Sequence, residues 1–320
     1  MTSRGLSACS VKHLPLSATS LALVLSCSLI WGGQAIAAKL AVNSVPPIMV
    51  LSLRFAMALP LLIVVAGIRR TSLRLSQRQL LLIVGNSVLV MIQLGLFLVG
   101  TGLTSTARSI VIVNTFPLFA AVAGHFLTND APVRRGQVAG LLIAFAGLSI
   151  VLLPRLTVDT STSLTGDLVV LTAAVIIGFK IAWMRRILGV LDPIQVVVWS
   201  SLLGAPLCFL LSLGMYDVAS IRFSVSSLGA IAYQGILVSG FAVLAWTYLL
   251  SQHAVNNLTV FRLATPPIGM FLGWMLLSES LDGMLLVGGA LIVAGIWSVH
   301  RTAAQSAVGA AAITDKRVEP

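Results

Sequence analysis

Long apolar stretches alternate with short polar ones along the whole chain, and this pattern predicts membrane-spanning helices. The apolar stretches run for about 18 residues or more, which is long enough for a helix to cross a bilayer. They are continuously apolar, whereas the strands of a membrane barrel would alternate apolar with polar residues. We predict an all-α integral membrane protein of about ten spans, at residues 17–38, 46–67, 79–100, 105–126, 137–153, 167–184, 193–213, 227–250, 255–277 and 283–299.

The composition agrees with a protein whose main solvent is lipid. The 320 residues are 58% hydrophobic and 9% charged, with a mean hydropathy of +1.04, and a soluble domain needs far more polar surface. The net charge of +11 is not gathered into a basic stripe interleaved with aromatic residues, so we predict no nucleic-acid partner. Cys9, Cys27 and Cys208 lack the spacing of a disulfide framework or a metal site, so we predict no metal and no cofactor.

Lysine and arginine positions predict which side of the membrane each connecting segment occupies. With the N-terminus in the cytoplasm, 13 of the 20 basic residues fall in cytoplasmic segments and 3 in exterior ones, the other four lying inside spans. An even number of spans places the C-terminus on the same side. We therefore predict a multi-pass protein of the cell (inner) membrane with cytoplasmic termini.

The first apolar stretch has an alternative interpretation. Arg4 and Lys12, followed by an apolar run that ends in Ala35-Ile36-Ala37, resemble a secretory signal with a small-residue cleavage site. The same stretch has a counterpart in the second half of the chain, which favours a retained first span.

An ordered series of prolines, glycines and polar residues occurs twice, which indicates an internal repeat. Small changes in the separation of the two copies are what loop insertions produce. The pairs are Pro47/Pro193, Arg54/Ser200, Pro60/Pro206, Gly32/Gly178, Gln34/Lys180 and Lys39/Arg185, each 146 residues apart, Pro117/Pro267, 150 apart, and Gly140/Gly288 and Gly147/Gly295, each 148 apart.

The repeat divides the chain into two units of five spans. An odd number of spans forces the second unit into the opposite orientation, and inverted repeats of this kind produce alternating access in transporters. The predicted segments are a cytoplasmic N-terminal tail (1–16), a first five-helix unit (17–153), an exterior connecting loop (154–166), a second five-helix unit (167–299) and a disordered cytoplasmic tail (300–320).

Several motifs together are similar to those of one family. They are Trp31-Gly32-Gly33 through Lys39 and Pro47 with Arg54 in the first half, and Pro267 with Glu279 and Gly288-Gly289-Ala290-Leu291-Ile292 to Gly295 in the second. Over roughly residues 17–299 the chain resembles the drug/metabolite transporter superfamily, specifically proteins with two EamA domains. The first half departs from the pattern, because Asn129 followed by Asp130 stands where the acidic residue would fall.

This resemblance implies a ten-helix fold with a central cavity lined by both halves. It also implies export or exchange of amino acids, metabolites or drugs, without choosing among them. The expected partners are a small-molecule substrate and the lipid bilayer, and a homodimer is left open.

Four basic residues lie inside predicted spans, where a charge costs about 2.5–3.5 kcal/mol and is usually turned toward protein or water. Arg54 is mid-span, where it either contacts substrate or bonds backbone carbonyls freed by a nearby proline. Arg262 is a substrate-pathway candidate, and Lys180 either contacts substrate or extends to the headgroups. Arg108, near an exterior helix end, is expected to extend to the headgroups.

The acidic residues all fall in predicted loops, span ends or the tail. A cavity faced by Arg54 or Arg262 is therefore expected to be electropositive. This distribution predicts a substrate that carries a carboxylate or another anionic group.

Aromatic and polar residues at repeat-matched positions suit a central pocket, so Trp31, Gln34 and Trp199 are further substrate-pathway candidates. Other polar residues within spans either join helices by hydrogen bonds or face the pocket. These residues are Asn86, Gln93, Asn114 and Gln234.

Prolines inside predicted spans mark candidate kinks. Pro117 and the pair Pro266-Pro267 each remove a backbone donor from an otherwise continuous helix. The resulting kinks either help to close the pathway or are static. Glu279 is expected at a helix end, as a capping or gating contact.

Glycines seven residues apart lie on one face of a helix and let helices approach closely. Gly140 with Gly147, and Gly288 with Gly295, have this spacing. We expect these four residues to pack helices together, with little role in substrate contact.

Other function classes have less support in the sequence. An intramembrane enzyme needs an activated nucleophile, paired acids or metal ligands, but the four histidines are scattered and no HExxH motif occurs. A channel would need a ring of selectivity groups, and the sequence shows none. A lipid flippase or a non-transporting partner subunit fits the same fold. No GxxxxGK[ST] motif occurs, so uphill transport would have to be secondary.

Overall fold

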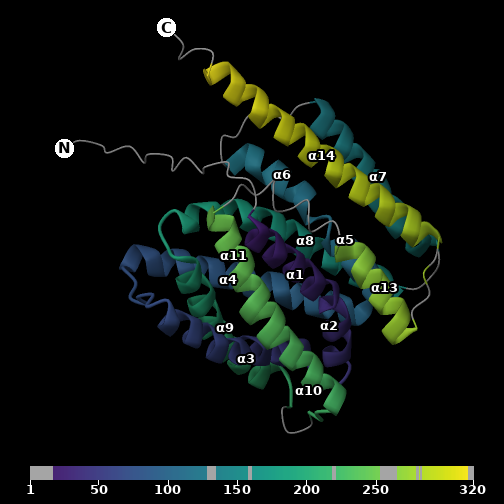
Figure 1. The fold of residues 1–320 in the computed structure, drawn as a ribbon. Helices are drawn as coiled ribbons and strands as arrows, with labels where there is room; N and C mark the ends of the chain where they lie inside the picture. Colours follow the sequence, from purple (N-terminus) through teal and green to yellow (C-terminus); the bar gives the residue numbers. More distant parts are fainter. Residues whose placement is uncertain are drawn as a thin grey trace.

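The computed structural model describes residues 17–127, 135–157, 161–217, 221–252, 265–278, 281 and 283–315, and regular structure in these residues is helical throughout (Figure 1). The elements are α1 (Ala18–Gly32), α2 (Gln34–Val42), α3 (Pro47–Ile68), α4 (Gln77–Leu103), α5 (Thr106–Val113), α6 (Phe116–Leu127), α7 (Arg135–Thr157), α8 (Ser161–Leu188), α9 (Pro193–Met215), α10 (Val225–Ala232), the π-helix η2 (Tyr233–Ala242), α11 (Val243–Gln252), α13 (Thr265–Leu277) and α14 (Gly283–Asp315).

The apolar helices of the described residues fall into two length classes. Six are long and apolar enough to cross a membrane, namely Ala18–Val42, Pro47–Ile68, Gln77–Leu103, Leu164–Ile181, Pro193–Met215 and Val225–Gln252. Thr106–Ala120, Val138–Ile150, Thr265–Leu277 and Gly283–Ser298 are shorter apolar helices. The all-α membrane fold is therefore as predicted, while the total of ten spans in two inverted units stays a prediction.

Local sequence explains where the long helices begin. Pro47 and Pro193 are the first residues of α3 and α9, where a missing backbone N–H costs nothing. Ser76 and Asp192 cap α4 and α9, and in both cases a glutamine three residues later bonds back to the cap. These polar caps satisfy backbone donors at the points where apolar helices start.

Two predicted spans are interrupted. The first divides at Gly33 into α1 and α2. The fourth divides at Asn114 and Thr115 into α5 and α6. The prediction that Pro117 lies inside a continuous helix is wrong, since it is the second residue of α6, a position where proline is tolerated. Pro266 and Pro267 lie at the start of α13 as described, but residues 253–264 before it lie outside the described residues, so the predicted kink there stays a prediction.

Two segments predicted as non-helical contain helix. The helix α14 continues to Asp315, through residues 300–315 of the predicted disordered tail. Alanine is the strongest helix former, so the Ala-rich composition of this segment favours helix rather than disorder. The predicted loop 154–166 is mostly helical too, because α7 ends at Thr157 and α8 begins at Ser161.

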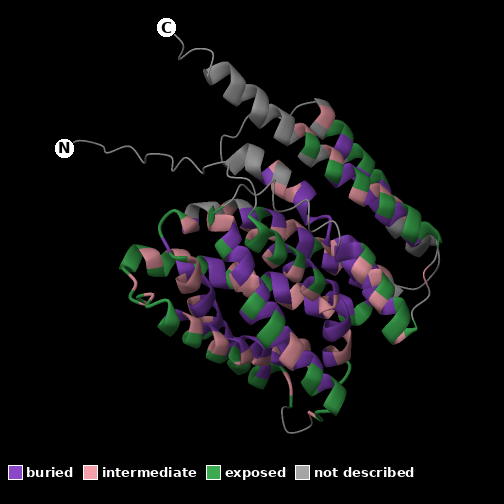
Figure 2. Cartoon of the chain, viewed as in Figure 1, coloured by how far each residue is buried: buried purple, intermediate pink, exposed green. Residues whose placement is uncertain are grey.

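Buried residues gather in the middle of the helical body, while the outer faces of the helices carry exposed apolar side chains (Figure 2). This is the distribution expected of helices in lipid, where apolar side chains face outward as readily as inward. The interior also contains polar side chains, including Arg54, Asn86, Gln93 and Gln234. In lipid these groups need partners inside the protein.

The helices α7 and α14 lie side by side, next to the other helices (Figure 1). Gly147 lies against Gly288 and Gly295 against Gly140, so the two helices run antiparallel and touch through glycine faces. A Cβ added to Gly295 would lie 2.5 Å from the Gly140 carbonyl oxygen. Side chains at these positions would push the two helices apart.

The helices α3 and α9 also pack in antiparallel fashion. The hydroxyl of Ser52 donates to the Ala205 carbonyl at 2.8 Å near one end of the pair. Toward the other end, Ala58 and Leu62 of α3 belong to one buried cluster with Val197 and Val198 of α9. The helices α7 and α14, and likewise α3 and α9, occupy corresponding positions in the two predicted units.

A buried ion pair joins α5 to α8. Arg108 donates from Nε and Nη2 to Oδ2 of Asp167 at 2.9 and 2.6 Å, and the Thr104 hydroxyl donates to Oδ1 at 2.7 Å. The side chains of Arg108 and Asp167 are 4% and 0% exposed. The expectation that Arg108 extends to the headgroups is wrong, because an inward carboxylate satisfies its charge.

The glycine contact between α7 and α14 predicts a stability effect. Gly147→Ala should destabilise the protein by about 1–3 kcal/mol, because the new Cβ would lie 2.7 Å from the Gly288 carbonyl oxygen. Gly85→Ala is the matched control, since nothing lies within 4 Å of its added Cβ. Thermal unfolding in detergent checks both variants. Equal unfolding temperatures for the two would contradict close packing at Gly147.

The ion pair predicts a second stability effect. Asp167→Asn should lower stability by about 3–5 kcal/mol, because it leaves a buried guanidinium without a countercharge. The double variant Arg108→Met, Asp167→Leu removes both charges and should recover much of the loss. Thermal unfolding measures both. An Asp167→Asn protein as stable as the wild type would show that the pair contributes nothing.

Candidate functional site

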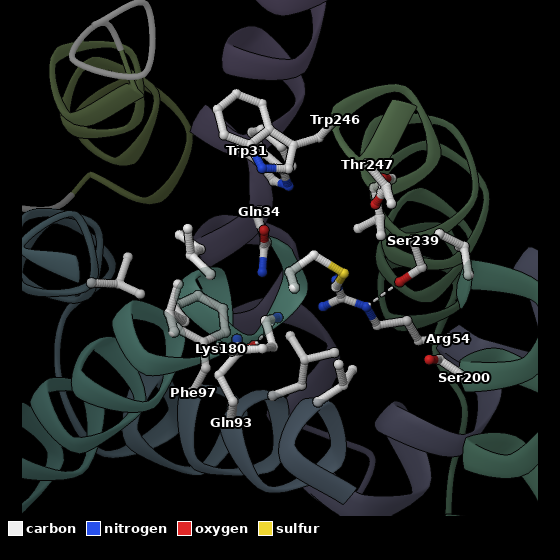
Figure 3. A pocket seen from close by; sticks show the side chains of 18 of the residues that line it. Trp31, Gln34, Arg54, Gln93, Phe97, Lys180, Ser200, Ser239, Trp246 and Thr247 are labelled. Carbon is white, nitrogen blue, oxygen red and sulfur yellow. Dashed lines mark hydrogen bonds between the residues drawn. The ribbon is translucent and has the colours of Figure 1, made fainter. Parts of the chain in front are cut away.

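A cavity of about 170 Å³ lies in the interior, between helices of the two halves of the chain. The helices α1 to α5 supply one part of its wall, and α8, α9, η2, α11 and α13 supply the rest. Its polar lining includes Gln34, Arg54, Gln93, Asn114, Lys180 and Ser239. Figure 3 shows Arg54 and Lys180 entering this space from different sides.

The sequence candidates divide into three groups. Four of the substrate-pathway candidates line the cavity, namely Trp31, Gln34, Arg54 and Lys180. Trp199 does not line it, because its indole Nε1 instead donates to the Leu73 carbonyl at 3.0 Å, in the link between α3 and α4. Arg262 and Glu279 lie outside the described residues.

The break between α1 and α2 places polar groups at the cavity. The Tyr233 hydroxyl donates to the Ile30 carbonyl at 2.6 Å, which satisfies a group in the last turn of α1. A Cβ on Gly33 would lie 2.6 Å from that hydroxyl oxygen, so glycine leaves room for this bond. Trp31 and Gln34 flank Gly33, and both face the cavity (Figure 3).

The break between α5 and α6 is satisfied by its own side chains. Asn114 Nδ2 donates to the Ile110 carbonyl at 2.7 Å, and the Thr115 hydroxyl donates to the Ile112 carbonyl at 2.7 Å. Non-helical backbone at membrane depth persists where it is buried or lines a cavity. Asn114 also lines the cavity, so both helix breaks border the same space.

Arg54 is the most deeply buried charge at the cavity, with 1% of its surface exposed. Its Nε donates to the hydroxyl of Ser239, and its Nη1 donates to Oε1 of Gln234 at 2.6 Å. Both partners are neutral oxygens. No described carboxylate lies within 4.0 Å of this guanidinium.

Lys180 is the second positive charge at the cavity. Its Nζ donates to Oε1 of Gln93 at 2.8 Å, again a neutral oxygen. No aspartate or glutamate occurs among the described residues of the lining. The described lining therefore carries two basic side chains and no carboxylate, and an anionic group would be stabilised beside them.

Aromatic side chains form part of the apolar wall, beside a larger number of aliphatic ones. The rings of Trp31 and Trp246 meet edge to face, with centroids 5.4 Å apart and planes at 79°. Phe55 and Phe97 line other parts of the cavity. A solute with an apolar body and a negatively charged end could contact both the apolar wall and the basic side chains of the lining.

The repeat extends to polar contacts that sequence reasoning did not assign to a site. Asn86 and Gln234 are 148 residues apart, the separation found for Gly140 and Gly288. Asn86 Nδ2 donates to the Ser200 hydroxyl at 3.1 Å, whereas Gln234 accepts from Arg54. Arg54 and Ser200 are themselves a repeat pair, so pairing each polar span residue with its counterpart would have identified this network.

The cavity wall also contains residues that sequence reasoning named only as general candidates or passed over. Trp246 lines the cavity, but its position in the sequence carries no specific signal. Ser239 and Thr247 are small polar residues in an apolar stretch, and nothing in the sequence distinguishes them from other span serines and threonines.

The model of the EamA-like transporter family matches the chain twice, over residues 18–153 and 164–300. The chain belongs to this family. The two matches cover both predicted five-helix units, and the resemblance to the drug/metabolite transporter superfamily is confirmed. Family membership also argues for transport over enzyme chemistry.

Curated relatives and a solved structure agree with this assignment. The "Uncharacterized transporter YoaV" of Bacillus subtilis is 25% identical over 86% of this chain and 94% of its own length. A "Probable amino-acid metabolite efflux pump" of Salmonella typhimurium is 25% identical over 86% of this chain and 92% of its own length. One crystal structure matches 88% of this chain and 96% of its own chain with a TM-score of 0.67 at 21% identity, which shows a shared fold.

Proposed function

We propose that this EamA-family protein is a secondary transporter that exports or exchanges a small carboxylate-bearing metabolite by alternating access. The observation that carries this proposal is the burial of Arg54 at an interior cavity with neutral oxygens as its only described partners. A buried charge without a countercharge is costly. A substrate carboxylate would supply that countercharge.

The geometry of Arg54 fits a carboxylate. Its Nε and Nη1 are engaged, but Nη2 has no hydrogen-bond partner among the described residues. Figure 3 shows the guanidinium directed toward the space below Gln34. A charge-assisted hydrogen bond from a guanidinium to a carboxylate is about twice as strong as one between neutral groups. Lys180 adds a second positive charge on another side.

The name of one relative supports an amino acid as the substrate. The Salmonella relative is named as a probable amino-acid metabolite efflux pump. In this chain, an amino group would meet amide oxygens rather than carboxylates, because the polar lining includes Gln34 and Asn114. The aromatic wall at Trp31 and Trp246 favours an apolar side chain.

The packing supports two inverted units. Corresponding helices α7 and α14 run antiparallel, as do α3 and α9, which is what opposite orientation of two similar units requires. Contacts recur as well, because Gly32 packs on Gly269 while its counterpart Gly178 packs on Phe119. Phe119 and Gly269 are 150 residues apart, the separation of Pro117 and Pro267.

The cavity reaches toward the basic ends of the helices. Val196 lies near the start of α9 and Leu250 near the end of α11, and both line the cavity. The amide of Gln195 donates to the Ser72 carbonyl in the arginine-rich link between α3 and α4. If that end is cytoplasmic, as the arginines predict, this arrangement is an inward-facing state.

The opposite end is held closed by charged contacts between helices. Lys39 at the end of α2 donates to the carbonyls of Thr101, Gly102 and Thr104 at 3.2, 3.0 and 2.6 Å. The Arg108–Asp167 pair lies beside Thr104 and links the two units. Opening to the exterior by separation of the two units would require the Arg108–Asp167 pair to part, whereas the Lys39 contacts lie within the first unit.

Counterflow with purified protein in proteoliposomes tests the proposed function. We expect uptake of labelled L-phenylalanine when unlabelled amino acid is inside, and little uptake of L-phenylalaninamide, which lacks the carboxylate. Arg54→Gln should raise the KM for L-phenylalanine at least about tenfold, since truncating one member of a buried charge pair costs about 2–5 kcal/mol. Arg78→Gln, at the exposed start of α4, is the charge-matched control.

Three outcomes would contradict the proposal. They are transport of the amide alone, flux that is unchanged in Arg54→Gln, and translocation of a fluorescent phospholipid without solute flux. A panel of other amino acids and of organic acids such as benzoate extends the counterflow test beyond the first solute. The phospholipid result would instead favour a lipid flippase.

Topology is tested by cysteine labelling in a variant that lacks Cys9, Cys27 and Cys208. A cysteine at 154–165 should react with an impermeant maleimide added to intact cells. A cysteine at 69–78 should react only after the membrane is permeabilised. The reverse pattern would overturn the cytoplasmic placement of the termini.

A further inference from the structure

The two partners of Arg54 both come from η2, the π-helical part of the segment 225–252. In η2 the hydrogen bonds span five residues, and the amide of Val243 accordingly bonds the carbonyl of Val238. Helices of this type are rare and short, and they occur frequently at functional sites. Here the π-helix has ten residues and contacts α3.

The π register determines which side chains of η2 share a face. Gln234 and Ser239 are five residues apart, so in an α-helix they would point about 140° away from each other. In a π-helix the residue five positions on stacks above the first, as the residue four positions on does in an α-helix. This register lets Gln234 Oε1 and Ser239 Oγ bond the same guanidinium.

Glycines bring this face of η2 against α3. A Cβ on Gly235 would lie 2.5 Å from Cβ of Met57 and 3.1 Å from the Arg54 carbonyl oxygen. A Cβ on Gly240 would lie 2.9 Å from a methyl carbon of Leu61. The backbone of η2 therefore lies directly beside the turn of α3 that carries Arg54.

The chemistry of the two partners is as informative as their placement. An amide oxygen and a hydroxyl orient a guanidinium without cancelling its charge. A carboxylate at either position would form an ion pair with Arg54 and compete with an anionic ligand. Gln234 is fully buried and Ser239 is 4% exposed, so both partners hold the guanidinium from within the protein.

We propose that Gln234 and Ser239 are positioning residues of the substrate site, and that the π register of η2 aligns them to direct Arg54 into the cavity. This inference rests on the proposed function, because it assigns Arg54 to the substrate carboxylate. It adds that η2, which belongs to the second unit, sets how tightly Arg54 of the first unit binds the substrate. The arginine and the residues that orient it therefore come from different units.

Point substitutions test the two side chains with L-phenylalanine as the probe. Gln234→Glu should raise the KM at least about tenfold, with an unchanged or higher unfolding temperature, because the new carboxylate pairs with Arg54. Ser239→Ala should raise the KM about tenfold, since it removes a hydrogen bond to a charged group. Ser239→Thr retains the hydroxyl and should recover most of that loss. A KM that stays at the wild-type value in Gln234→Glu and Ser239→Ala would overturn the inference.

Single-residue deletions test the register itself. Leu237 and Phe241 both expose their side chains on the outer surface, and deleting either one should convert η2 to an α-helix. Deletion of Leu237 leaves Gln234 and Ser239 four residues apart and therefore on one α-helical face. Deletion of Phe241 leaves them five apart and therefore splits them. We expect the variant that lacks Leu237 to keep a low KM and the variant that lacks Phe241 to have a higher KM.

The outcomes separate this inference from the proposed function. Equal KM values in the two deletion variants, with both proteins folded by thermal unfolding, would overturn the role of the register. If neither deletion variant folds, the point substitutions decide. If the wild type carries L-phenylalanine and Arg54→Gln abolishes it while the substitutions in η2 have no effect, only this inference fails. If the wild type carries no carboxylate solute, the proposed function fails first.

Discussion

A guanidinium held inside the membrane by neutral oxygens is the constraint on which the rest of this structure depends. In lipid there is no water to satisfy a buried polar group, so each must find a partner in the protein. Arg54 meets this requirement through Gln234 and Ser239, which orient its charge but do not cancel it. At the cavity, hydrogen bonds therefore hold the Arg54 guanidinium in position, while no described residue neutralises its charge.

The irregular helices follow from the same constraint. The break at Gly33 depends on a hydroxyl from Tyr233, and the break at Asn114 depends on its own amide. Both breaks border the cavity, and η2 does so from a third direction. At each of the two breaks, a side chain thus makes a hydrogen bond to a backbone carbonyl of the interrupted helix. The remaining long helices need no such help and stay regular.

The apolar pattern was sufficient to predict the helices, and the motifs were sufficient to indicate the family, because span length and the positions of prolines and glycines are properties of the sequence itself. It could not predict contacts that depend on the other half of the chain. Arg108 and Asp167 each lie near a predicted span end, and only their juxtaposition makes them a buried pair. Gly33 gave no signal of a break, since the stabilising Tyr233 is distant in sequence.

The candidate site shows the same division. Arg54 and Lys180 were predicted from their positions within spans, where a charge requires explanation, and both line the cavity. Trp199 was predicted as an aromatic residue at a repeat-matched position, but it bonds the Leu73 carbonyl instead, because position along a helix does not determine which way an indole points. Arg54 and Ser200 occupy corresponding positions in the repeat, and of the two only Arg54 carries a charge, whereas Ser200 carries a hydroxyl. For a carrier of singly charged anions, that asymmetry has an electrical consequence: an occupied site carries one positive charge fewer than an empty one, whereas a zwitterionic amino acid leaves the net charge of the site unchanged. A membrane voltage, which acts on one elementary charge with about 2.3 kcal/mol per 100 mV, would then act more strongly on the empty carrier than on a carrier loaded with an anion.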